Sequence, residues 1–86
     1  PEHTSYYAKV DEQFGSDDPR GLVRRRHTVA PIDEYFGRDG AWHPTEYLVR
    51  YALGHNDVDH VEITPAEALI IMERWTARWA AERAGS

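Results

Sequence analysis

The sequence predicts a single compact α+β domain over residues 1–86: a small twisted antiparallel sheet of three to four strands, with a short helix and a long C-terminal helix packed on one face. Three observations predict this fold. Short segments of alternating side chains precede Thr64 and are separated by turn-forming residues. A strong helix-start signal at Thr64 opens a long amphipathic segment. The chain is long enough to bury one hydrophobic core. Residues 1–4 and 84–86 are expected to fray.

Three strands are expected in the first half of the chain. Residues 5–10 alternate with the two-residue period of a half-buried strand. Residues 22–29 have no cleanly apolar face, which indicates a strand with one side in water, and Pro31 ends it. Residues 32–36 form the third expected strand, which the turn formers at 37–40 close.

A short helix and a fourth strand are expected next. The helix is predicted from Thr45 to about Leu53, with Pro44 in its first turn, where a missing N–H costs nothing. Gly54 is placed to adopt the left-handed conformation just past the end. Residues 60–63 then form a short strand.

The long C-terminal helix has the clearest local signal. Thr64 is an N-cap, Pro65 takes the first helical position, and Glu67 lies three residues after the cap, which together make a capping box. The helix is expected to run from Pro65 to about Arg83. The residues on its predicted core stripe are Ala68, Ile71, Met72, Trp75 and Trp79.

Composition narrows the classes of function. The chain has no cysteine, which excludes disulfides, thiolate nucleophiles and cysteine-ligated zinc sites. No apolar run approaches the roughly 18 residues of a membrane span, so no membrane contact is expected and a cytoplasmic location is the default. So small a domain has little room for a deep substrate cavity, and no catalytic dyad or phosphate loop has the required spacing. We therefore expect a non-enzymatic chain without a cofactor.

The leading hypothesis is a small cytoplasmic interaction or regulatory module that binds a protein partner or forms a homo-oligomer. The back of the long helix carries Ile70, Arg74 and Ala77 among further alanines, and small side chains let another helix approach closely. Trp42 is added to this partner-binding set because exposed tryptophan is enriched at protein interfaces.

An alternative hypothesis is that the chain binds nucleic acid or a phosphoryl ligand through an arginine-rich strand. The arginines are Arg20, Arg24, Arg25 and Arg26. The net charge of −5 opposes binding of a polyanion, and alternation divides the run between two faces of the strand. The competing interpretation is cross-strand ion pairing. The acidic residues available for it are Asp11, Glu12, Asp33 and Glu34.

A second alternative is a metal site at His55, Asp57, Asp59 and His60. Imidazole and carboxylate groups in one connection are what a divalent metal requires. The segment nevertheless lacks the oxygen spacing of a calcium loop and the helical histidine pair of a zinc site. The competing interpretation is that both aspartates hydrogen-bond to local amides at a turn and a strand end.

Four segments carry a resemblance to known proteins. They are Tyr6-Tyr7-Ala8-x-Val10, Asp18-Pro19-x-Gly21-x-x-Arg24-Arg25, Trp42-x-Pro44-Thr45 and Val61-Glu62-Ile63-Thr64-x-x-Glu67-Ala68. With these segments the chain resembles small uncharacterised actinobacterial proteins over nearly its whole length. That group has no assigned activity, so the resemblance implies a cytoplasmic setting and assigns no role to any residue.

Overall fold

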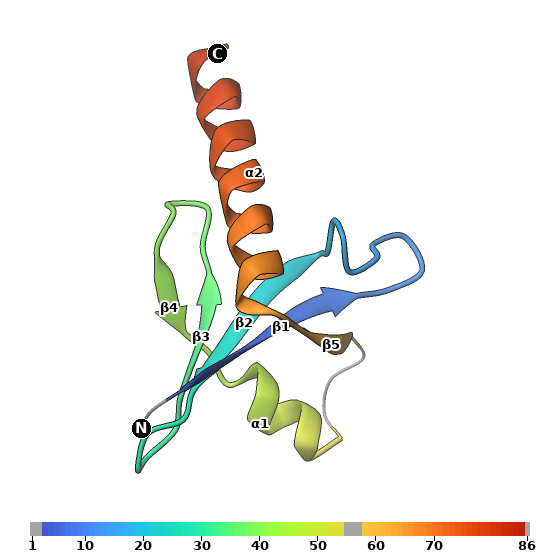
Figure 1. Cartoon of the computed structure of the whole chain (residues 1–86). Coiled ribbons are helices and arrows are strands. Elements are labelled where there is room, and N and C mark those ends of the chain that lie inside the picture. Colours follow the sequence, from blue (N-terminus) through green and yellow to red (C-terminus); the bar gives the residue numbers. More distant parts are fainter. Residues whose placement is uncertain (1–2, 55–57, 86) are drawn as a thin grey trace.

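The computed structural model describes residues 3–54 and 58–85 and has an α+β fold (Figure 1). Within these residues the chain forms five strands and two helices. They are β1 (Thr4–Val10), β2 (Gly21–Arg26), β3 (Ile32–Phe36), β4 (Trp42–Pro44), α1 (Tyr47–Ala52), β5 (Asp59–Ile63) and α2 (Pro65–Ala84). Neither helix is both long enough and apolar enough to cross a bilayer.

The five strands form one antiparallel sheet in the order β4-β3-β2-β1-β5. The sequence predicts at most four strands, one fewer than the sheet contains, because β4 gives no recognisable pattern. Its three residues are too few to show alternation, and Pro44 was assigned to a helix. Pro44 instead lies opposite Glu34 on an edge strand, where its missing N–H breaks no ladder.

The second strand is shorter than predicted because the chain needs a longer turn. β2 ends at Arg26, which pairs with Thr4 of β1 on one side and with Ile32 of β3 on the other. The residues between Arg26 and Ile32 reverse the chain into β3, and Val29 is fully exposed in this turn. The strand predicted over 22–29 therefore stops three residues early.

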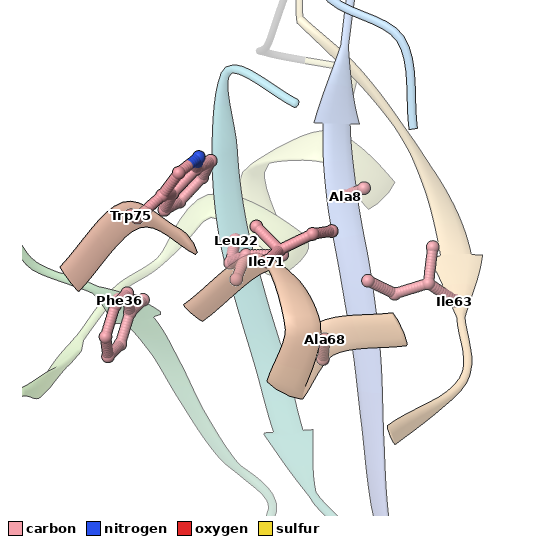
Figure 2. Packing of buried hydrophobic residues seen from close by; sticks show 7 residues of the cluster. All are labelled: Ala8, Leu22, Phe36, Ile63, Ala68, Ile71 and Trp75. Atoms are coloured by element: carbon pink, nitrogen blue, oxygen red, sulfur yellow. The ribbon is translucent and has the colours of Figure 1, made fainter. Parts of the chain in front are cut away.

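The main hydrophobic core lies between α2 and one face of the sheet, where α2 crosses β1 and β2 (Figure 2). Alanines on both sides of this contact, Ala8 and Ala68, are fully buried. Their small side chains allow the helix to lie close to the strands. The buried cluster is Ala8, Leu22, Phe36, Ile63, Ala68, Ile71 and Trp75.

The short helix α1 packs on the opposite face, so the prediction of both helices on one face is wrong. Neighbouring residues of a strand point to opposite faces, and Val23 therefore points away from Leu22. Val23 packs with Tyr47 and Leu48 of α1. Both Leu22 and Val23 are fully buried, which also contradicts the expectation that this strand has one side in water.

The ends of α1 match the prediction at one terminus. The helix begins at Tyr47, whose amide donates a hydrogen bond to the Thr45 hydroxyl over 3.1 Å, rather than at Thr45 itself. Gly54 follows the helix with φ of +78°, the left-handed conformation that favours glycine, as predicted.

The capping box at the start of α2 is confirmed. The Glu67 amide donates to the Thr64 hydroxyl over 3.1 Å, and the Thr64 amide donates to the Glu67 carboxylate over 3.0 Å. Pro65 occupies the first helical position. The helix then continues to Ala84, one residue beyond the predicted end.

Replacing Thr64→Ala removes the hydroxyl that caps α2. We expect the free energy of unfolding to fall by about 1 kcal/mol, the usual loss for a threonine N-cap, when measured by urea denaturation. Thr76→Ala is the matched control, because Thr76 is exposed within α2 and alanine favours a helix interior. An equal loss in both variants would show that the cap contributes nothing.

Candidate functional site

The helix α2 has an outer surface that no part of the described chain covers. Its buried side chains, Ala68, Ile71 and Trp75, all precede the last nine residues of the helix. In Figure 1 the C-terminal turns of α2 extend beyond the strands. The surface opposite the buried side chains is therefore open along the whole helix.

This outer surface is mostly apolar. Ile70 and Leu69 are 57% and 54% exposed and lie side by side on this surface. Around them lie exposed alanines, and Glu73 is the charged residue at the centre of the surface. The alanines are Ala66, Ala77, Ala80, Ala81 and Ala84. We call Leu69, Ile70 and these five alanines the alanine face.

Most of the alanine face follows the spacing of a helix–helix contact. Steps of four and three residues alternate, which keeps the positions on one stripe of an α-helix and is the pattern of coiled-coil seams. The positions are Ala66, Ile70, Glu73, Ala77, Ala80 and Ala84. Sequence reasoning identified Ile70 and Ala77 with the further alanines Ala66, Ala81 and Ala84, but it missed Leu69, Ala80 and this regular spacing.

Two members of the predicted partner-binding set lie outside the alanine face. Arg74 borders it, and its guanidinium donates to the Asp17 carbonyl oxygen over 2.6 Å, which joins α2 to the β1–β2 loop. Trp42 lies in β4 and packs against the main core, on the side of α2 that faces the sheet. The structure thus brings Ile70 and Ala77 together, places Arg74 at the edge and separates Trp42 from all three.

The predicted arginine strand is ion-paired. Arg24 and Arg26 point to the same face of the sheet, and their Nε atoms lie 2.9 Å and 3.1 Å from the same Glu34 oxygen. Arg20 precedes β2 and pairs with Asp11 over 2.9 Å. These contacts are the cross-strand pairing that the sequence offered as the alternative to anion binding.

Arg25 points to the opposite face and makes the most regular of these pairs. Its Nε and Nη2 atoms donate to the two carboxylate oxygens of Asp33 over 2.7 Å and 2.9 Å. The hydrogen bond to Asp33 raises the pKa of Arg25. The Asp33 side chain is only 9% exposed, so this bidentate pair is a structural contact between β2 and β3.

The predicted metal site is only half described, because His55 and Asp57 lie outside the described residues. Asp59 accepts hydrogen bonds from the Tyr51 hydroxyl over 2.6 Å and from the His60 amide over 2.8 Å. The bond from Tyr51 holds the pKa of Asp59 below its usual range. Within residues 3–54 and 58–85, no group of three or more candidate ligands could hold a metal ion.

His60 lies instead in an aromatic cage that sequence reasoning did not identify. The ring of Tyr7 on β1 and those of Tyr47 and Tyr51 on α1 pack edge-on against the imidazole. The Tyr47 oxygen lies 3.1 Å from His60 Nδ1 and donates to the Val58 carbonyl oxygen over 2.6 Å. Burial lowers the pKa of His60 and raises the pKa of Tyr47 to about 12. The cage assembles residues from three elements, which no local motif reveals.

The lowered pKa of His60 makes stability depend on pH. The folded state binds the imidazole proton more weakly than the unfolded chain, so stability falls as the pH drops through the ordinary value of 6.5 toward the lowered one. We expect thermal unfolding of the wild type to shift down between about pH 7.5 and about pH 5 by more than that of His60→Gln. Parallel pH profiles for the two proteins would contradict this role of His60, whatever their absolute stabilities.

Comparison of the chain with protein-family models, with curated proteins and with solved structures finds no match. Its function is therefore inferred from the geometry of its own side chains.

Proposed function

We propose that this chain is a non-enzymatic protein-interaction module that binds a helix of another chain, a partner protein or a second copy, along its alanine face. The observation that carries the proposal is the regular stripe of exposed small and aliphatic side chains on α2. A single exposed Ile70 or Leu69 would be ordinary. Their union with four exposed alanines at contact spacing, Ala66, Ala77, Ala80 and Ala84, is what favours an interface.

The chemistry of the face selects a helix as the occupant. Alanine side chains let two helix axes approach to about 8 Å, the short end of the usual range, and the backbones then gain close van der Waals contact. Burying the exposed halves of Ile70 and Leu69 contributes on the order of 1 kcal/mol each. The alanines add contact area more than hydrophobic free energy, so the expected association is specific in geometry and modest in strength.

For a second copy, the charge pattern favours antiparallel pairing. When Ala66 of one helix faces Ala84 of the other, Glu73 faces Ala77 and Ile70 faces Ala80. In a parallel pair the two Glu73 carboxylates would meet at the centre of the contact, where like charges are destabilising. The antiparallel arrangement avoids this meeting and repeats each contact twice, as a two-fold interface requires.

The arginine strand does not favour a second candidate function. Arg20, Arg24, Arg25 and Arg26 each face a carboxylate at hydrogen-bond distance. A polyanion would have to displace Glu34 and Asp33, whose side chains are largely buried, against a net charge of −5.

Replacing Ala77→Glu places a charge and added bulk at the centre of the alanine face. We expect wild-type protein to self-associate with rising concentration in sedimentation velocity, or to retain a partner from lysate, and A77E to weaken that association at least about tenfold. The control Val49→Glu adds the same charge to an exposed position on α1, away from the alanine face, and should leave association unchanged.

The proposal fails on a defined result. It is wrong if wild-type protein stays monomeric at high concentration and retains no protein that A77E loses. Equal loss of association in A77E and V49E would also contradict it, because the effect would then come from the added charge rather than from the face.

A further inference from the structure

A cavity of about 340 Å³ opens between α2, the start of β2 and the turn that joins β3 to β4. Its volume falls within the range of small-molecule sites. It lies beside the main core, on the side of α2 away from the alanine face. Its walls combine two kinds of side chain, aromatic rings and arginine guanidiniums.

The aromatic wall is continuous. The rings of Phe36 and Trp79 are stacked, with centroids 5.9 Å apart and planes inclined by 24°. Trp75 lies beside Trp79, with centroids 5.8 Å apart, and Phe14 also lines the cavity. Trp75 and Phe36 lie together at one end of the buried cluster in Figure 2. A flat apolar molecule could stack on such a wall.

Three guanidiniums border the same space. The guanidinium carbon of Arg38 lies 5.5 Å from the centre of the Trp79 ring and that of Arg20 lies 5.8 Å from the centre of the Phe14 ring, both within cation–π distance. Arg78 enters from α2. A guanidinium carries its N–H donors in a planar fork, which suits a carboxylate or phosphate.

The ion pairs of Arg38 and Arg78 are exposed and therefore exchangeable. Arg38 pairs with Glu82 over 2.7 Å, and both side chains are more than half exposed. Arg78 lies 3.6 Å from Asp18, the one carboxylate in the described lining. Exposed pairs of this kind contribute little to stability, so an incoming anion can compete with them.

The carboxylate of Asp18 does not make the net charge of the cavity lining negative. Its Oδ1 atom lies within 4 Å of both Arg74 and Arg78, and the Trp75 Nε1–H donates to it over 3.4 Å. The lining therefore holds three guanidiniums and one carboxylate that is already surrounded by donors. Because Arg20 is paired with Asp11 over 2.9 Å, Arg38 and Arg78 are the guanidiniums that an anion would meet.

We propose that this cavity binds a small organic anion with a flat apolar body. The body packs against Trp79, which is only partly buried, and the carboxylate or phosphate group takes hydrogen bonds from Arg38 and Arg78. This site goes beyond the proposed helix contact, since it uses a different side of α2 and a different class of ligand.

The test is an NMR titration that follows the indole N–H signals. Phenyl phosphate and benzoate carry both ligand features, inorganic phosphate carries the anion alone, and benzyl alcohol carries the ring alone. We expect saturable shifts of the Trp75 and Trp79 signals with the first two probes, with Kd on the order of millimolar, and weaker binding of the other two. The stronger of the first two probes shows whether the site prefers phosphate or carboxylate.

Variants locate the site. Arg38→Gln and Arg78→Gln should each weaken phenyl phosphate binding about tenfold, the loss expected for one charged hydrogen bond. Arg50→Gln is the matched control, because Arg50 is an exposed, ion-paired arginine on α1 outside the cavity. A77E should bind the probe normally, which separates this site from the helix contact.

Three results would overturn the proposal. They are the absence of saturable shifts at about ten times the expected Kd, equal binding by R38Q, R78Q and R50Q, and inorganic phosphate binding as tightly as phenyl phosphate. The last result would mean that the aromatic wall takes no part. Thermal unfolding of each variant confirms that it is folded before it is titrated.

Discussion

Leu22 and Val23, neighbours on the central strand β2, are buried on opposite faces of the sheet, and the two helices depend on them. Leu22 anchors α2, and Val23 anchors α1. Because β2 has a strand on each side, neither residue can reach water unless a helix leaves the sheet. This contact sets which stripe of α2 faces inward, and the helical period then turns Ile70 and Ala77 outward. The alanine face and the cavity beside Trp79 are consequences of the same docking.

The features that could be predicted from the sequence are those that depend on neighbouring residues or on the register between strands. The capping box needs only Thr64 and Glu67, and the pairing of the arginines with acidic residues follows from the order of the strands. β4 escaped prediction because three residues show no period. The side of the sheet that α1 covers depends on how the chain leaves the edge strand β4, and no local sequence pattern predicts this. The cage around His60 and the cavity beside α2 likewise assemble residues that are distant in sequence.

Arginine has two different roles in this small domain, and the exposure of its partners separates them. In the sheet, Glu34 and Asp33 are 13% and 9% exposed and hold their arginines in fixed positions between strands. Around the cavity, the pairs of Arg38 and Arg78 lie near the surface, where water and ions screen them. The first group is part of the framework. The second keeps its donors within reach of the solvent in a chain that is acidic overall.

The single residue between β5 and α2 has a mechanical consequence. β5 ends at Ile63 and α2 begins at Pro65, and the two hydrogen bonds of the capping box fix Thr64 between them. A twenty-residue helix is thus joined to an edge strand by a link with little freedom to bend. Any pull or tilt at the far end of α2 acts as a lever on β5, which pairs with β1 alone. Once the packing of α2 on β1 and β2 gives way, load on the helix would peel the outermost strand β5, the geometry in which backbone hydrogen bonds break one after another.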